Sequence, residues 1–352
     1  MTEEPPTTGR PPTTTVIGEA LIDMVQLMAP GDYRAHPGGS PFNVAIGLAR
    51  LGHRTSLMAR LADNAFGRML RAHATAERVD LTRSPRATEP TTLAVVSMDP
   101  QGRARYDFYL DGTADWQWTE AETARIPTDT AVLHFGSVAS WTSPGGEHIH
   151  TAAERLRAEG TALISYDPNI RPALLGEAER GRHAVERSVG VAHVVKASRE
   201  DAEWLSPGTP IERIAARWLD LGALLVVITD GPDGAHVFPA GAEPFSRPGR
   251  KVAVVDTVGA GDAFTAGLLG ALLRRGLHTP RRLAAVESAV LAAAVDDAVL
   301  VSALTCERMG ADPPTAHPRP DRPADAPLTE ADLTFDPAER DRTPEPARAL
   351  QS

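Results

Sequence analysis

The chain has 352 residues, of which 42% are hydrophobic, and a formal net charge of −10 at pH 7. This length and apolar content suffice for one large domain with a sizeable core, and the acidic balance argues against a general nucleic-acid surface. No stretch approaches the roughly 20 apolar residues of a membrane span, and the N-terminus lacks the apolar core of a signal peptide. The single cysteine, Cys306, excludes an internal disulfide. We therefore expect a cytoplasmic protein with no membrane or nucleic-acid partner.

Both ends of the chain have the composition of disordered segments. Residues 1–14 are rich in Pro and Thr, and residues 315–352 are rich in Pro, Asp, Glu and Arg. Within the second segment, residues 328–333 could form a brief turn of helix against the body, but disorder is the favoured prediction. The folded domain is accordingly predicted over residues 15–314.

Between these tails, apolar strand candidates alternate with helices. The alternation predicts an α/β fold, with a mostly parallel sheet covered by helices on both faces. The predicted buried strands are residues 16–21, 55–59, 131–135, 162–166, 191–195, 224–229 and 251–255. The predicted helices are residues 41–51, 66–77, 149–159, 180–188, 200–205, 211–221, 263–275 and 286–304.

Two segments do not fit this layering. They are residues 24–36 and residues 91–110, and the second has turn residues at 99–102. Residues alternate in hairpin fashion on either side of that turn, at Val95 and Ser97 and then at Tyr106 and Phe108. We expect these segments to form strands outside the main sheet.

A first glycine motif, Gly38-Gly39, leads into a predicted helix that Gly52 terminates. Backbone N–H groups are exposed at such a helix start, and Asn43 offers an amide donor and a carbonyl acceptor to a polyol. On its own, a Gly-Gly pair more often marks an ordinary turn into a core helix.

A second glycine motif spans residues 256–264 and couples an anion-binding backbone to a carboxylate. Gly259, Ala260 and Gly261 stand at a strand-to-helix turn, where N–H groups without internal partners and the helix dipole would stabilise a phosphate. Asp262 would repel that phosphate unless it has a chemical task, and general base toward a substrate hydroxyl is such a task. A helix cap is an equally good explanation of Asp262 on the motif alone.

Two better-known phosphate loops are excluded by spacing. The dinucleotide fingerprint GxGxxG would require glycine in place of Phe264. A P-loop requires Gly-Lys before Ser or Thr, and the only lysines, Lys196 and Lys251, follow Val195 and Arg250. A Walker-type nucleotide site is therefore not expected.

Taken together and in this order, the two glycine motifs closely resemble the signatures of the PfkB family of carbohydrate kinases, from about residue 16 to residue 314. The resemblance implies a ribokinase-like three-layer fold with a small β lid, formed by residues of about 24–36 and 91–110. It also implies an ATP-dependent kinase of a sugar primary hydroxyl. In many relatives paired lids form a dimer interface, so a homodimer through the lid is the corresponding expectation.

The resemblance assigns roles to individual residues. It makes Asp262 the general base, beside an anion hole formed by the backbone N–H groups of Gly259, Ala260, Gly261 and Asp262. The segment 167–171 resembles the DxNxR element of fructokinase-like and ketodeoxygluconate kinase-like members. The substrate ligands that the resemblance implies are Asp23, Gly38, Gly39, Asn43, Tyr106, Phe108 and Arg171.

The resemblance also implies a nucleotide site and its cations. The ATP-site candidates are Ser198, Thr229, Gly231, Gly234 and Gly261. Magnesium would bind largely through phosphates and waters. In relatives an NxxE motif orders the magnesium ion, and this chain departs from it, with Ser198 in place of the asparagine and Asp201 in place of the glutamate. Glu200 is a possible substitute for that glutamate. A role as helix N-cap explains Ser198 equally well. Some relatives bind potassium beside the anion hole, where Asp256 and residues 305–310 stand here.

The acceptor sugar is less defined than the reaction. Fructokinase-like members are the best match, and ketodeoxygluconate, ribose or a nucleoside are alternative acceptors. Leu110 stands where fructokinase-like lids often have arginine, and this departure counts against fructose as the acceptor. The acidic pair Asp296-Asp297 is unusual for the family and leaves the nucleotide preference open. The rival of another class is a non-catalytic sugar or nucleotide sensor, against which an intact Asp262 argues, because a binding module has no use for a general base.

Overall fold

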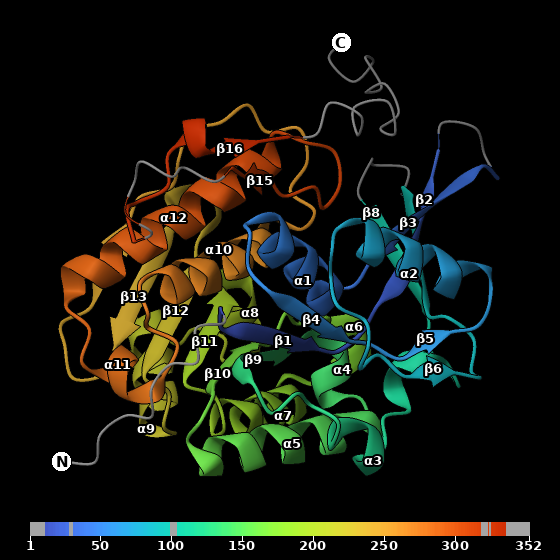
Figure 1. Cartoon of the computed structure of the whole chain (residues 1–352), viewed down its shortest axis with the longest axis horizontal. Helices are drawn as coiled ribbons and strands as arrows, with labels where there is room; N and C mark the ends of the chain where they lie inside the picture. Colours follow the sequence, from blue (N-terminus) through green and yellow to red (C-terminus); the bar gives the residue numbers. More distant parts are fainter. Residues whose placement is uncertain (1–10, 28–30, 99–103, 318–322, 324, 336–352) are drawn as a thin grey trace.

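The computed structural model describes residues 11–27, 31–98, 104–317, 323 and 325–335 (Figure 1). Its middle layer is an eight-stranded sheet in the order β14-β13-β12-β11-β10-β9-β1-β4. All pairs from β12 to β4 are parallel, and β13 and β14 continue the sheet antiparallel. The strands are β1 (Thr13–Ile17), β4 (Thr55–Met58), β9 (Thr130–Gly136), β10 (Leu163–Asp167), β11 (Val194–Ser198), β12 (Leu225–Thr229), β13 (Ala235–Pro239) and β14 (Phe245–Arg247). The predicted α/β fold with a mostly parallel sheet is confirmed.

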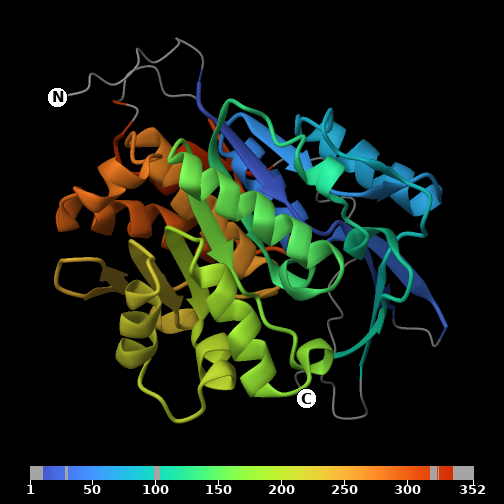
Figure 2. The ribbon, with the colours of Figure 1, turned by 90° about the horizontal axis from the view of Figure 1, so that it is seen from below.

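Helices cover both faces of this sheet (Figures 1 and 2). Adjacent strand residues point to opposite faces, so that Val16 joins one hydrophobic cluster and Ile17 the other. One face packs against α1 (Ser40–Arg50), α10 (Ala260–Arg274) and α12 (Ser288–Cys306), with α2 (Ala65–Ala76) beside them. The other packs against α5 (Gly145–Glu159), α7 (Ala178–Val189), α8 (Arg199–Leu205) and α9 (Ile211–Asp220). Shorter elements complete the layers: β5 (Leu61–Ala62), β6 (Arg86–Ala87), η1 (Ala114–Trp116), α3 (Glu120–Thr123), α4 (Ser137–Trp141), α6 (Pro172–Leu175), η2 (Gly231–Asp233) and α11 (Pro280–Ala284).

A second, four-stranded sheet stands apart from the main one, in the order β3-β2-β7-β8. It consists of β2 (Leu21–Gln26), β3 (Tyr33–Gly38), β7 (Leu93–Met98) and β8 (Ala104–Tyr109). Strands were expected outside the main sheet over residues 24–36 and 91–110, and these segments supply them. The predicted turn at 99–102 lies outside the described residues.

Two strand predictions need correction. The predicted strand 16–21 is split, because the backbone turns at Gly18 and β2 begins at Leu21 in the other sheet. Residues 251–255 form no strand, and Val254 and Val255 are 63% and 53% exposed. The sheet edge is instead occupied by β14, paired with β13. A β-branched run suits any extended backbone, so composition did not distinguish a strand from an exposed segment.

Helix α12 contradicts the expectation that no apolar stretch approaches the length of a membrane span. Within the described residues it is the one helix long and apolar enough for a span by length and composition. The helix packs along α10, and 56% of its most apolar 18-residue segment is buried. Burial inside the fold therefore explains its apolar composition. Both acidic residues of the helix are in ion pairs: Asp297 with Arg274 and Arg275, and Asp296 with Arg247. The unusual acidic pair therefore has a structural explanation.

The structure also departs from the prediction of disorder from residue 315 onward. Strand β15 (Thr315–Ala316) pairs with β16 (Leu333–Thr334), which follows the short helix η3 (Glu330–Asp332). Leu333 is buried, and the Leu328 N–H donates to Asp297 Oδ1 at 2.7 Å. The Leu328 contact depends on a carboxylate of α12, which the composition of the segment does not reveal. The predicted tails at 1–10 and 336–352 lie outside the described residues.

Candidate active site

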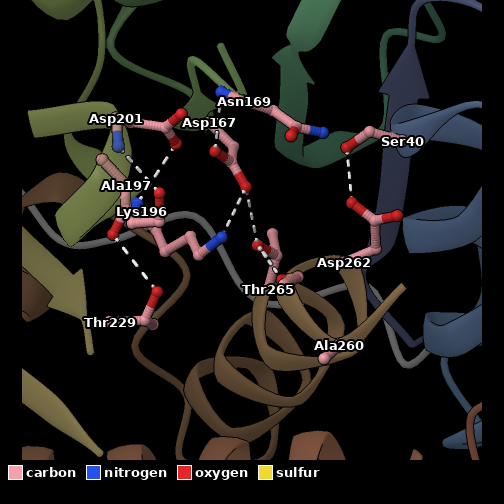
Figure 3. A network of polar contacts seen from close by, with 12 residues as sticks. Ser40, Asp167, Asn169, Lys196, Ala197, Asp201, Thr229, Ala260, Asp262 and Thr265 are labelled. Carbon is pink, nitrogen blue, oxygen red and sulfur yellow. Dashed lines mark hydrogen bonds and ion pairs between the residues drawn. The ribbon is translucent and has the colours of Figure 1, made fainter. Parts of the chain in front are cut away.

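Asp262 lies in the first turn of α10 and faces α1 (Figure 3). Its carboxylate accepts hydrogen bonds from Ser40 Oγ at 2.6 Å and from Asn43 Nδ2 at 2.9 Å. The N-cap of α10 is Gly259, which has no side-chain cap bond. Asp262 is therefore held by another helix and does not cap its own, so the cap explanation is wrong.

The Asp262 carboxyl is harder to ionise in this buried site than it would be in water. Burial raises the pKa of Asp262, and the nearby Asp167 adds to this effect. The hydrogen bonds from Ser40 and Asn43 and the charge of Lys196 act in the opposite direction. A buried carboxylate with a raised pKa is a better proton acceptor than an exposed aspartate.

The turn before α10 has the backbone that an anion hole needs. Gly259 has a φ of 75°, and a Cβ there would lie 2.4 Å from Ala311 Cβ, so only glycine fits. The Ala260 N–H donates to the Thr257 carbonyl at 3.2 Å and is thus already used in the turn. The N–H groups of Gly261 and Asp262 lie in the first helical turn, where no intrahelical acceptor exists. Of the predicted hole, these two positions have the better donors for an anion.

Beneath this turn, Lys196 of β11 and Asp167 of β10 form a buried ion pair, with Nζ and Oδ2 3.0 Å apart (Figure 3). Thr265 Oγ1 of α10 lies 3.4 Å from the same carboxylate oxygen. Burial lowers the pKa of Lys196, but the carboxylates of Asp167, Asp201 and Asp262 outweigh it, and the net direction is upward. Lys196 is therefore a charged group at the base of the site.

Arg171 and Asp23 belong to the side of the site next to the second sheet. Burial raises the pKa of Asp23 to about 6, while the charge of Arg171 lowers it and that of Asp262 raises it. These three predicted residues are thus close enough to interact. Arg171 Nη1 donates to Asn169 Oδ1 at 2.7 Å, which orients its guanidinium.

The first glycine motif makes room for this arrangement. A Cβ on Gly38 would lie 2.1 Å from Asp23 Oδ2, so the missing side chain leaves space for the carboxylate. Gly39 has a φ of 103° and is the N-cap of α1, which carries Ser40 and Asn43. Phe108 is half-buried on β8, and the side chain of Tyr106 lies outside the described part. The predicted substrate residues other than Tyr106 therefore have defined positions.

Four nucleotide candidates lie at or just after the ends of β11 and β12, namely Ser198, Thr229, Gly231 and Gly234, and the fifth, Gly261, lies in the first turn of α10. Thr229 is on the other side of the start of α10 from Ser40 (Figure 3). Ser198 caps α8, since its Oγ accepts from the Asp201 N–H at 3.0 Å. Thr229 Oγ1 donates to the Ala197 carbonyl at 3.4 Å. Gly231 and Gly234 have positive φ values in the turn between β12 and β13. Each candidate has a structural role, and a nucleotide role would be additional.

The cation candidates are already engaged with the backbone. Asp201 accepts from the Ile170 N–H at 3.0 Å and the Ser198 N–H at 3.2 Å, one on each oxygen, and Glu200 is exposed. Each Asp201 oxygen thus already has one backbone donor, and contact with magnesium through water fits this arrangement. Asp256 accepts from the N–H groups of Val258 at 3.1 Å and Gly310 at 2.8 Å, and these hydrogen bonds join the two loops. Among described residues, no group of three or more His, Cys, Asp or Glu side chains could hold a metal.

Three residues of this site were not predicted from the sequence: Ser40, Lys196 and Thr265. Ser40 follows the Gly-Gly pair directly, and Thr265 follows Asp262 by three residues, but neither residue type is distinctive. Lys196 did carry a signal, because it is one of only two lysines among 36 basic residues.

Comparison with known proteins extends over the whole domain. The chain matches the pfkB family carbohydrate kinase domain over residues 13–317. It is 36% identical over 277 residues to a fructokinase of Rhizobium leguminosarum bv. trifolii, an alignment that covers 78% of this chain and 84% of the relative.

Two solved structures show the same similarity in three dimensions. The fructokinase of Xylella fastidiosa with bound ATP has a TM-score of 0.78 at 26% identity, over 85% of this chain and 93% of that chain. The fructokinase of Vibrio cholerae O395 with fructose, ADP and calcium ion has a TM-score of 0.73 at 29% identity, over 85% of this chain and 94% of that chain. With both glycine motifs inside the matched region, the chain belongs to the pfkB family of carbohydrate kinases.

Proposed function

We propose that this kinase transfers the γ-phosphoryl group of ATP to a primary hydroxyl of fructose or a closely similar sugar, with Asp262 as general base. The observation that carries the proposal is the buried Asp262 carboxylate, which Ser40 and Asn43 hold beside the N–H groups of the first turn of α10. The relatives named as fructokinases support fructose as the acceptor.

The site suits a reaction governed by positioning and electrostatics. The sugar would bind between Asp23, Asn43 and Arg171, with its hydroxyl toward Asp262. As the Asp262 carboxylate takes the hydroxyl proton, the oxygen attacks the γ-phosphorus and the bond to the β-phosphate oxygen breaks. The N–H groups of Gly261 and Asp262 would stabilise the charge on the transferring group. Magnesium, bound through the phosphates and water, would neutralise part of the phosphate charge.

The small β-sheet is placed to act as a lid, because its strand β2 carries Asp23. A lid over the sugar excludes water, which would otherwise compete as phosphoryl acceptor. Tyr33 and Tyr109 of this sheet are 40% and 60% exposed. Two such lids facing each other would cover these rings, so a homodimer through the lid is part of the proposal.

A coupled assay of ADP release tests the function directly. The panel contains fructose, ribose, 2-keto-3-deoxygluconate and a nucleoside, each with ATP and magnesium. ADP release that depends on fructose is expected, and release with another acceptor only would replace fructose in the proposal. Sugar binding without ADP release for any acceptor would favour a non-catalytic sensor.

Activity is expected to fall as the pH drops through about 6, the pKa of Asp23. Burial also raises the pKa of Asp262, so its carboxyl loses its charge at a higher pH than an exposed aspartate does. Protonation removes an acceptor for the sugar and the base for its hydroxyl. We expect kcat/KM for the sugar to decrease on this side, and Asp23→Asn to raise KM and remove one of the two titrations. A profile that stays flat well below pH 6 would contradict this assignment.

Stability should respond in the opposite direction. For Asp23, the folded-state pKa of about 6 is above the ordinary value of 3.8. Its contribution to the free energy of unfolding is therefore greatest below pH 3.8 and is lost as the pH rises through about 6. Denaturation measured against pH in the wild type and in Asp23→Asn separates this effect from the change in activity.

A further inference from the structure

Lys196 is an unusual residue for this chain. Of 36 basic residues only two are lysines, and the other, Lys251, is exposed. Lys196 is 5% exposed, in a strand at the centre of the sheet. Burying a charged ammonium group is costly unless a carboxylate pairs with it, and Asp167 does so here at 3.0 Å. A chain that uses arginine almost everywhere has a lysine at this one buried position.

The position of the ammonium group relates it to the first turn of α10. A Cβ on Gly261 would lie 3.0 Å from Lys196 Nζ, so the ammonium group lies against the Gly261 backbone. The absence of a side chain at Gly261 thus leaves space for Lys196 as well as for an anion. A guanidinium is broader than an ammonium, which explains why arginine is not used here.

The charge of Lys196 reaches Asp262 as well as its direct partner. Lys196 lowers the pKa of Asp262, and Asp262 raises that of Lys196, as expected for two opposite charges that interact. The other titratable groups that interact with Asp262 or Lys196 include Asp23 of β2, Asp167 of β10, Asp201 of α8 and His134 of β9. Lys196 is the cation among the groups that act on Asp262 most strongly, so its removal would leave that carboxylate among like charges.

We propose that Lys196 is a positioning residue, whose ammonium group, held by Asp167, stabilises the ionised Asp262 carboxylate and adds positive charge behind the N–H groups of Gly261 and Asp262. The proposal rests on the proposed function, in which Asp262 is the base and this turn is the anion hole. It assigns to the Lys196–Asp167 pair a task beyond holding β10 against β11.

The first test does not require turnover. Selective ¹⁵N labelling of lysine gives side-chain signals from only two residues, and Lys251→Arg identifies which signal belongs to Lys196. Asp262→Asn should shift the Lys196 signal, and so should a non-hydrolysable ATP analogue with magnesium. The exposed Lys251 signal is the internal control. A Lys196 signal that responds to neither would overturn the proposal, whatever the activity of the enzyme.

The second test uses the pH profile of turnover. Lys196→Met should lower kcat by about 10- to 100-fold, less than the loss of a direct oxyanion donor, with a smaller change in KM for the sugar. Its acid limb should move to higher pH by about 1 to 3 pH units, because Asp262 loses a neighbouring cation. Lys251→Met is the matched control and should leave the profile unchanged.

A folding defect is separated by a second variant. Lys196→Met leaves Asp167 buried without its partner, whereas Asp167→Asn combined with Lys196→Met removes both charges. The double variant should recover stability in thermal melts. Because Asp167 raises the pKa of Asp262 and Lys196 lowers it, Asp167→Asn alone should move the acid limb to lower pH, opposite to Lys196→Met. Displacement of the limb in the same direction by both single variants, or by neither, would show that Lys196 is structural only, and the proposed function would still stand on the wild-type assay.

Discussion

Asp262→Asn is expected to lower kcat by about 10²- to 10⁴-fold, the usual contribution of a general base. Asparagine has the shape of aspartate and can still accept a hydrogen bond from Ser40, which now donates to the carboxylate at 2.6 Å. It has no basic oxygen for the sugar proton. Calorimetry should therefore show ATP and sugar affinities close to those of the wild type while turnover is lost.

Ser40→Ala is the graded comparison for this prediction. It removes one of the two hydrogen bonds from α1 that orient Asp262 and leaves the carboxylate in place. Its kcat should lie between those of the wild type and Asp262→Asn. Near-normal turnover of Asp262→Asn would remove Asp262 from the proposed mechanism, and equal losses in both variants would indicate a general disturbance of α1 and α10.

Asp297→Ala is expected to lower the free energy of unfolding by about 3 to 5 kcal/mol, since it removes one partner of a buried ionic cluster. Asp297 is 1% exposed and accepts from Arg274 Nη2 and Arg275 Nη1, both at 2.8 Å, as well as from the Leu328 N–H. The alanine variant would leave both guanidinium groups and the Leu328 N–H without this acceptor. Urea denaturation measures the difference.

The neighbouring Asp296 is a matched control on the same helix. It forms two hydrogen bonds of 2.7 Å with Arg247, but the two side chains are 42% and 35% exposed. A pair in water contributes about 0 to 1 kcal/mol, so Asp296→Ala should be nearly neutral. Similar costs for the two variants would contradict the distinction between the buried and the exposed pair.

The parts of the fold that were predicted correctly are those with a local cause. Alternating apolar strands and amphipathic helices predicted the α/β fold, because their periods follow from backbone geometry. Predictions failed where a local pattern has two outcomes: residues 251–255 have strand composition but are exposed, and residues 325–335 have tail composition but pack against α12. The sheet edge is already occupied by β14, so residues 251–255 add no strand to it. Leu328 is held by the Asp297 carboxylate, 31 residues away in sequence, which the composition of the segment cannot show.

For the site, the sequence was sufficient to predict the family, because each glycine motif is a local arrangement of a turn followed by a helix start. It could not distinguish whether Asp262 caps its own helix or faces a neighbouring one. That depended on Ser40 and Asn43, more than 200 residues earlier, which only the packing of α1 against α10 brings to its carboxylate. The buried pair of Lys196 and Asp167 likewise exists because β10 and β11 are neighbours in the sheet. The motifs encode the chemistry, and the tertiary contacts determine which charges surround it.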